Sequence, residues 1–251
     1  MYFYVMESPT SPRIRRLEEQ ILTTIRGYGI SGEVVLANPA RPARELARAG
    51  LSKGYATIVA IGGDRVINDV AAAVQGTRAS MGIIPIDAHP RIPQLIGSLD
   101  PLIACEALRR QEVVYTDIAF IDPGYYFLTD IQVEQANEFP IRAHIDDVIV
   151  ETTITRLTLN GDGHLELLND RQGRSLISQF ATRFTGKPAP APNISSFQGQ
   201  YIKIETSRAF SVTSGGRTVA KTPFVAAVKP NALKLIVKRG TVRSTNSPDG
   251  E

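Results

Sequence analysis

The stretch IVAIGGDRVINDV, residues 58–70, decides the fold class of this chain. It begins with a continuous apolar run, which is typical of a strand buried on both faces of a parallel sheet. Two glycines and an acid follow, and the apolar spacing after them predicts a helix. Glycines allow a tight turn and a close approach to a ligand, and N–H groups at a helix start attract phosphates. The stretch therefore predicts a turn that binds an anion, or one that merely caps the helix.

Strands and helices alternate on both sides of this stretch. Ser11 before Pro12 marks a helix start, and apolar residues then recur at spacings of three and four. The predicted strands cover residues 2–6, 33–37, 56–61 and 81–86, and the predicted helices cover 14–25, 43–51, 66–74 and the surroundings of 104–108. This alternation predicts a three-layer α/β domain over residues 1–111, with ligands bound beyond the carboxyl end of the 56–61 strand.

The pattern changes after residue 111, where strand patterns dominate and turn signals separate them. The clearest of these signals is Asn-Gly-Asp-Gly at 160–163, which predicts a hairpin. The predicted strands cover residues 113–121, 125–131, 148–159, 164–168, 177–185, 200–206, 209–213, 218–228 and 233–237. Residues 187–192 read as an extended loop and 244–251 as a frayed tail. Residues 112–251 are therefore expected to form a mostly β, sandwich-like domain, whose last strand could return to the first domain.

Composition excludes several classes of protein. Hydrophobic residues make up 43% of the 251 and charged residues 21%, which is ordinary for a globular protein and excludes wholesale disorder. The net charge of +3 comes without a dense basic cluster, so nucleic acid is not an expected partner. Cys105 is the only cysteine, and no apolar run is long enough to span a membrane. These features predict a cytoplasmic protein.

Several motifs resemble the diacylglycerol kinase catalytic-domain family, a bacterial lipid-kinase branch related to NAD kinases. That family has the pattern GGDGT-x-N-E between a strand and a helix, and this chain has Gly62, Gly63 and Asp64 followed by Asn68 and Asp69. The stretch MGIIPI at 81–86 resembles the family's LGIIPLG. Residues 43–48, 116–128 and 222–233 also resemble family segments, so the likeness touches most of the chain.

The chain departs from the family pattern at the expected active site. Arg65 stands where the family has the glycine after GGD, and residues 87–93, DAHPRIP, replace its GTGND segment. Residues 214–217 replace an Asp-Gly-Glu with no acid, and a Gly-rich turn is absent at 129–133. Phosphoryl transfer depends on positioning and charge neutralisation, and one well-placed electrostatic group is worth about 2.7–4 kcal/mol. Losing several together predicts a diverged or inactive kinase.

The resemblance implies ATP-dependent phosphorylation of a diacylglycerol-like lipid hydroxyl, with ATP and Mg²⁺ as cofactors, although the lost acids weaken the expectation of Mg²⁺. The alternative is a catalytically inactive kinase-fold binding or scaffold protein. A lipid or the inner membrane face is a candidate partner, and an exposed sheet edge could pair two copies as a homodimer. The residues assign no general base and no metal ligand.

Two groups of candidate site residues follow from the loops. Gly62, Gly63, Asp64 and Asn68 are expected on the nucleotide side. Arg65, His89 and Arg91 form the second group; they could bind phosphate in place of a metal ion, since arginine binds phosphate through a two-pronged fork. The alternative for this second group is a set of solvated loop side chains.

Overall fold

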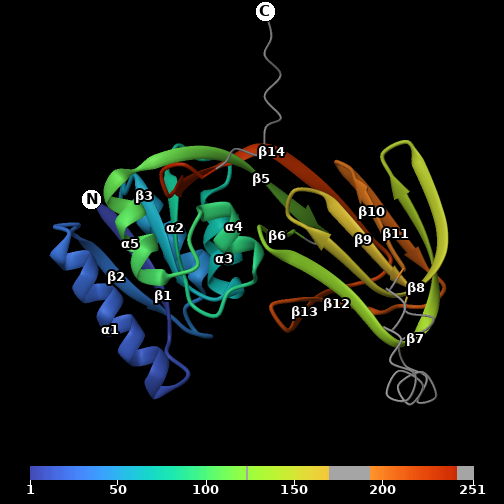
Figure 1. Ribbon diagram of the computed structural model, residues 1–251, viewed down its shortest axis with the longest axis horizontal. Helices are drawn as coiled ribbons and strands as arrows, with labels where there is room; N and C mark the ends of the chain where they lie inside the picture. The colour runs from blue at the N-terminus through green and yellow to red at the C-terminus, as the bar shows by residue number, and fades with distance from the viewer. Residues whose placement is uncertain (123, 170–192, 242–251) are drawn as a thin grey trace, which may run out of the picture. The chain divides into compact units, whose positions relative to one another are not determined.

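The computed structural model describes residues 1–122, 124–169 and 193–241. The chain divides into two compact units (Figure 1), the first made of residues 1–116 with 231–251 and the second of residues 117–230. The sequence places a boundary between 111 and 112 and leaves open a return of the last strand to the first domain. The last strand does run back into the sheet of the first unit.

The first unit alternates strands and helices, as the sequence predicts. Its strands are β1 (Tyr2–Glu7), β2 (Gly32–Ala37), β3 (Thr57–Gly62), β4 (Ser80–Pro85) and the end of β14 (Phe224–Val237). Its helices are α1 (Pro12–Gly27), α2 (Ala43–Ser52), α3 (Asp64–Val74), α4 (Arg91–Ile96) and α5 (Pro101–Arg110). The sheet order is β14-β4-β3-β1-β2, and all neighbours are parallel.

Helices cover both faces of this sheet, which gives three layers. Successive residues of β1 point to opposite faces. The Tyr2 hydroxyl donates to the Leu108 carbonyl of α5 at 2.7 Å, whereas the ring of Phe3 lies against Gly50 of α2. Every residue of β3 is buried. The three-layer α/β prediction is therefore confirmed.

Local sequence explains where α1 begins. The Ser11 side chain accepts a hydrogen bond from the Ile14 N–H at 3.3 Å, and Pro12 occupies the first helical position. Ile21 and Ile25 are buried, four residues apart on one face. The helix thus follows the apolar spacing that the sequence shows.

The second unit is mostly β, as predicted, and its described residues contain no helix. Its strands are β5 (Glu112–Ile121), β6 (Tyr125–Phe127), β7 (Asp130–Ile145), β8 (Val148–Asn160), β9 (His164–Asn169), β10 (Asn193–Gln198), β11 (Tyr201–Thr206), β12 (Ser211–Ser214), β13 (Arg217–Lys221) and the start of β14. Antiparallel pairs link β10, β9, β8, β7, β11 and β14 in that order.

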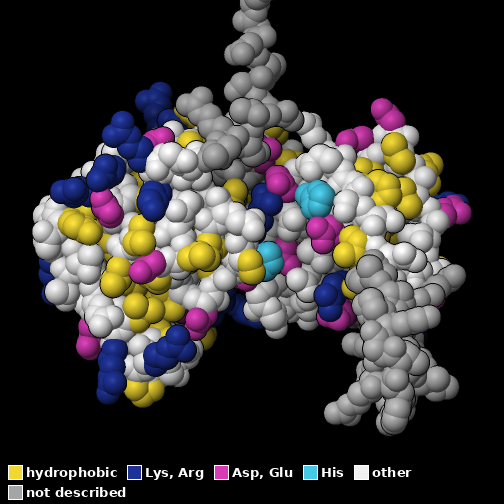
Figure 2. Space-filling view, viewed as in Figure 1, with side chains coloured by type: hydrophobic (Ala, Val, Ile, Leu, Met, Phe, Trp, Pro, Cys, Tyr) yellow, Lys and Arg dark blue, Asp and Glu magenta, His cyan; other side chains and the backbone are white. Residues whose placement is uncertain are grey.

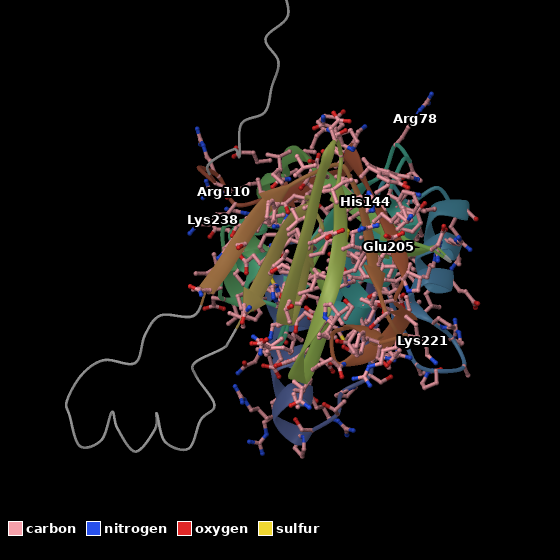
Figure 3. All side chains as sticks on the ribbon, turned by 90° about the vertical axis from the view of Figure 1, so that its right-hand side faces the viewer. Arg78, Arg110, His144, Glu205, Lys221 and Lys238 are labelled. Carbon is pink, nitrogen blue, oxygen red and sulfur yellow. The ribbon has the colours of Figure 1, made fainter. Side chains whose placement is uncertain are left out.

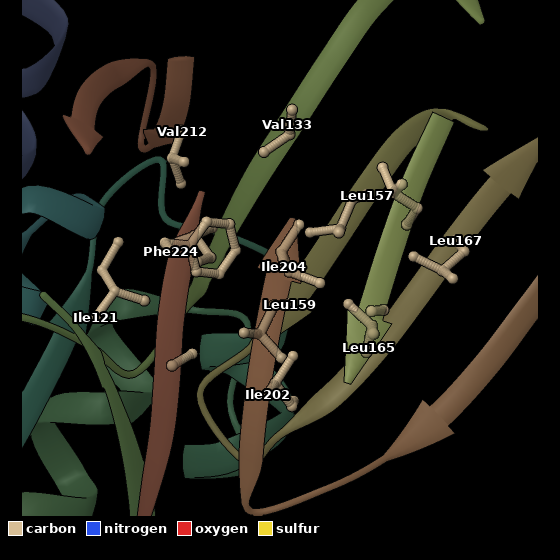
Figure 4. Packing of buried hydrophobic residues seen from close by; sticks show 14 of the residues in the cluster. Ile121, Val133, Leu157, Leu159, Leu165, Leu167, Ile202, Ile204, Val212 and Phe224 are labelled. Carbon is tan, nitrogen blue, oxygen red and sulfur yellow. The ribbon is translucent and has the colours of Figure 1, made fainter. Parts of the chain in front are cut away.

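Alternate residues of these strands build one apolar core (Figure 4). Leu157 and Leu159 of β8, Leu165 of β9 and Ile202 and Ile204 of β11 point into it. Burial of such side chains stabilises the unit by about 1.5–3 kcal/mol each relative to exposure. The period of two in the sequence is therefore the signal that specifies which face is buried.

Several predicted strand limits are wrong. The predicted 125–131 strand is β6 plus the start of β7, and the predicted 218–228 strand is split between β13 and β14. Pro223, which has no N–H to donate, lies between the latter two. The sequence reasoning missed β10, α4 and most of β7. Three predictions fall outside the described residues: the strand over 177–185, the loop over 187–192 and the frayed tail over 244–251.

Candidate functional site

The Gly62-Gly63-Asp64 turn lies where β3 ends and α3 begins. Gly62 has a φ of +147°, which favours glycine, and a Cβ there would lie 2.9 Å from the Cβ of Glu7. The Ile86 N–H donates to the Gly62 carbonyl at 3.0 Å, and the Ile67 N–H donates to the Gly63 carbonyl at 3.1 Å. The residue that follows β4 and the first turn of α3 thus hold the turn in place. The Gly63 N–H lies at the start of the helix.

A carboxylate of the chain itself occupies this helix start. Glu7 is the last residue of β1, which neighbours β3. Its Oε2 accepts the Gly63 N–H at 3.2 Å, and its Oε1 accepts Arg65 Nη2 at 2.6 Å and Nε at 3.1 Å. A backbone donor and a guanidinium therefore converge on one oxyanion, in the manner of a phosphate site.

The Glu7–Arg65 pair is half-buried, with 26% and 34% of the two side chains exposed. Water reaches it, so the pair can open at a cost much smaller than that of a fully buried ion pair. Sequence reasoning missed Glu7. The available signal is its position directly after the first predicted strand, because carboxyl ends of neighbouring parallel strands meet at the same edge of a sheet.

Asp64 connects the turn to the loop after β4. Its Oδ1 accepts the His89 N–H at 2.7 Å, and His89 Nδ1 accepts the Arg91 N–H at 3.3 Å. Asp87 in the same loop has a φ of +51°, a conformation in which aspartate is enriched. The structure therefore brings Asp64 and His89 together and gives Asp64 a role in holding this loop.

Two other predicted site residues, Asn68 and Arg91, lie on helices that follow the turn and the loop after β4. Asn68 is on the buried side of α3 with 1% of its surface exposed. Arg91 is the first residue of α4. Contacts of Asn68, His89 and Arg91 with a nucleotide remain predictions.

Other chemically suggestive groups have structural explanations. Asp146 accepts the N–H groups of Gln200 and Tyr201, which closes a turn. His144 Nε2 lies 3.4 Å from Glu205 Oε2 on the outer face of β7 and β11 (Figure 3). Hydrogen bonding from Lys203 lowers the pKa of Glu205. The His144-Ile145-Asp146-Asp147 segment of the sequence thus lies at a strand and the turn that follows it.

The structure also shows what the Asn-Gly-Asp-Gly sequence at 160–163 and Cys105 do. The Gly163 N–H donates to the Asn160 carbonyl at 3.0 Å in the turn between β8 and β9, which confirms the predicted hairpin. Cys105 packs inside the first unit, and burial raises its pKa to about 12. The Gly186-Lys187-Pro188 sequence, which lacks the upstream glycine and the following Ser or Thr of a Walker phosphate loop, lies outside the described residues.

Within the described part of the chain, no three His, Cys, Asp or Glu side chains are grouped closely enough to hold a metal ion. None of the helices seen there has the length and apolar character needed to cross a membrane.

Part of this chain resembles a known protein family, and most of the chain resembles solved structures. Residues 4–121 match the family model of the diacylglycerol kinase catalytic domain. The chain resembles the structure of a diacylglycerol kinase from Bacillus anthracis str. Sterne, with 15% identity, a TM-score of 0.72 and coverage of 96% of this chain and 98% of that one. A second structure from that strain, provisionally described as a diacylglycerol kinase, gives 14% identity and a TM-score of 0.75 over the same shares.

At such low identity the structural likeness shows a shared fold and nothing more. No curated protein matches the chain. The family model covers the sheet from β1 to β4, the Gly62-Gly63-Asp64 turn and β5. Residues 4–121 are therefore similar to the diacylglycerol kinase catalytic domain.

Proposed function

We propose that this chain is a diverged lipid kinase family member that binds the phosphates of ATP at its Gly62-Gly63-Asp64 turn without efficient transfer to a lipid. One observation supports the binding most directly. The Gly63 N–H and the Arg65 guanidinium both hold the carboxylate of Glu7. A phosphate oxygen has the same charge and the same acceptor chemistry, so it can replace that carboxylate.

Phosphate binding requires Glu7 to leave the turn. Arg65 then exchanges its carboxylate partner for a phosphate, and the Gly63 N–H keeps an anionic acceptor. Because Arg65 supplies positive charge, we propose that binding does not depend on Mg²⁺, which the family leads one to expect. Mg²⁺ is usually held by one or two carboxylates together with phosphates. Asp64 is the carboxylate of the turn that would hold it, and one of its oxygens already accepts the His89 N–H.

Binding is tested by titrating a non-hydrolysable ATP analogue into the parent protein and into Arg65→Ala. We expect millimolar or tighter binding by the parent and at least a tenfold loss in the variant, because the variant also leaves the Glu7 charge unpaired. Arg110→Ala is the matched control, since it breaks a comparable ion pair with Glu106 on α5. EDTA should leave the parent's affinity unchanged. Equal affinities for the parent and Arg65→Ala would overturn the proposal.

The second candidate function is ATP-dependent phosphorylation of a diacylglycerol-like hydroxyl at a membrane surface. The family match over residues 4–121 favours it. Transfer of labelled γ-phosphate to diacylglycerol in mixed micelles distinguishes the two. We expect rates far below the roughly 1–100 s⁻¹ of ordinary kinases. Turnover within that range would establish the second function, and an absence of any nucleotide binding would favour a scaffold that binds neither substrate.

A further inference from the structure

Glu18 is a buried acid that the phosphate-binding turn does not use. It lies in the second turn of α1, on the same helix face as Ile21 and Ile25, and only 6% of its surface is exposed. Its carboxyl forms no hydrogen bond and no ion pair with any residue that the structure describes. A buried carboxylate without donors is costly, so this position favours the protonated acid.

The neighbours of Glu18 act on its charge in opposite directions. Burial raises the pKa of Glu18 above its ordinary value, Arg15 on the same helix opposes that shift, and the negative charge of Glu7 adds to it. Glu7 is near because only residues 8–11 connect the end of β1 to the start of α1. Glu18 therefore keeps its proton more readily than an exposed glutamate does.

The other charged groups around α1 are exposed or have partners elsewhere. The arginines of its first turns are exposed, and Figure 2 shows Lys and Arg side chains at the surface where Figure 1 places the start of this helix. The helix α5 also packs against α1. There Glu106 pairs with Arg110, and Arg109 lies over the Tyr28 ring. Glu7 is thus the acid that acts on the buried carboxyl.

We propose that Glu18 is a positioning residue that receives Glu7 when a phosphate displaces Glu7 from its turn. Protonated Glu18 donates its O–H to the displaced Glu7 carboxylate. This bond replaces those that Glu7 loses to the Gly63 N–H and to Arg65, and it is charge-assisted like them. This role rests on the proposed function, since Glu7 leaves the turn only when a phosphate takes its place.

Phosphate binding is then linked to the protonation of Glu18. The protonated form donates to Glu7, whereas the ionised form repels it. Affinity is therefore highest where the free protein already holds this proton, and it falls as the pH rises through the pKa of Glu18. Where Glu18 is ionised in the free protein, binding takes up a proton.

Two substitutions of Glu18 test this role by calorimetric titration of a non-hydrolysable ATP analogue at about pH 6 and pH 8. Glu18→Gln keeps a donor at every pH, and Glu18→Leu has none. We expect Glu18→Leu to bind about fivefold more weakly than the parent at the lower pH. Glu18→Gln should match the parent there and bind more tightly than the parent at the higher pH. The analogue's own titration is common to all three proteins, so the differences report Glu18.

The controls are Glu19→Gln and Glu19→Leu, because Glu19 is the next residue and is exposed. Both should follow the parent at each pH. A parent that binds while Glu18→Leu binds equally well would overturn the role of Glu18 alone, as would identical pH profiles for the parent and Glu18→Gln. A parent that binds no analogue at either pH would overturn the phosphate site, and this role with it.

The proximity of the two acids is tested without any ligand. Carbon-13 NMR of the side-chain carboxyls follows the titration of Glu18 in the parent and in Glu7→Gln. We expect Glu18 to titrate at lower pH in Glu7→Gln, because one cause of its raised pKa is removed. A titration that does not change would overturn the pairing of Glu7 with Glu18.

Discussion

At the residue scale, Gly62 determines the geometry of the anion-binding turn. Its φ of +147° lies in a region that L-residues rarely adopt, and a Cβ would come 2.9 Å from the Cβ of Glu7. We expect Gly62→Ala to lower the free energy of unfolding by about 2–3 kcal/mol. Urea denaturation followed by circular dichroism measures this change.

Gly27→Ala is the control for that substitution. Gly27 has helical backbone geometry, and nothing lies within 4 Å of a Cβ built there. Alanine at such a site leaves stability within about 1 kcal/mol or raises it. If both alanine variants lose the same stability, then the strain attributed to Gly62 is absent.

At the element scale, the start of α5 depends on one side chain. Asp100 accepts the Leu102 N–H at 2.8 Å, and Pro101 follows at the first helical position. Removing such a cap costs about 1 kcal/mol. Asp100→Ala should therefore lower the melting temperature of the first unit by a few degrees.

Asp100→Ser controls for that loss. Serine retains an acceptor of comparable reach, so its melting temperature should stay close to that of the parent. A loss as large as that of Asp100→Ala would mean that the charge of Asp100, rather than its hydrogen bond, stabilises the helix start. Scanning calorimetry of both variants decides between the two.

The helices and buried strands of the first unit could be predicted from the sequence because each has a local signal. Ser11 and Pro12 marked the start of α1, and the continuous apolar run before Gly62 marked β3. In the second unit the signals are weaker. The strand β7 continues past Gln132 through a stretch with a shift in register, which no periodic pattern predicts.

The candidate site could be predicted only in part. The glycine turn is local, so the sequence placed it correctly. The partner of the turn is Glu7, which is 56 residues distant from Gly63 and is brought close only by the pairing of β1 with β3. The same holds for Asp64 and the His89 N–H, which are 25 residues apart. Contacts of this kind depend on strand order, which a single sequence does not specify.

At the scale of the whole molecule, Cys105 reports on global unfolding. It is fully buried, and desolvation raises the pKa of its thiol to about 12. Because a raised pKa keeps the thiol protonated, the reactive thiolate is nearly absent in the folded protein up to pH 9. We expect labelling by a thiol reagent to be slow in buffer and fast in denaturant. Rapid labelling at pH 8 without denaturant would contradict this burial.

In the proposed function, Glu7 and a phosphate compete for the Gly63 N–H and Arg65. Calorimetric titration of a non-hydrolysable ATP analogue into Glu7→Gln and the parent tests it most directly. Glutamine retains an acceptor for the Gly63 N–H but removes the competing charge and frees Arg65, so we predict about tenfold tighter binding. Glu106→Gln, which removes an equal charge on α5, should match the parent. Affinity that is unchanged or weaker in Glu7→Gln would contradict the claim that this turn is an anion site filled by its own chain.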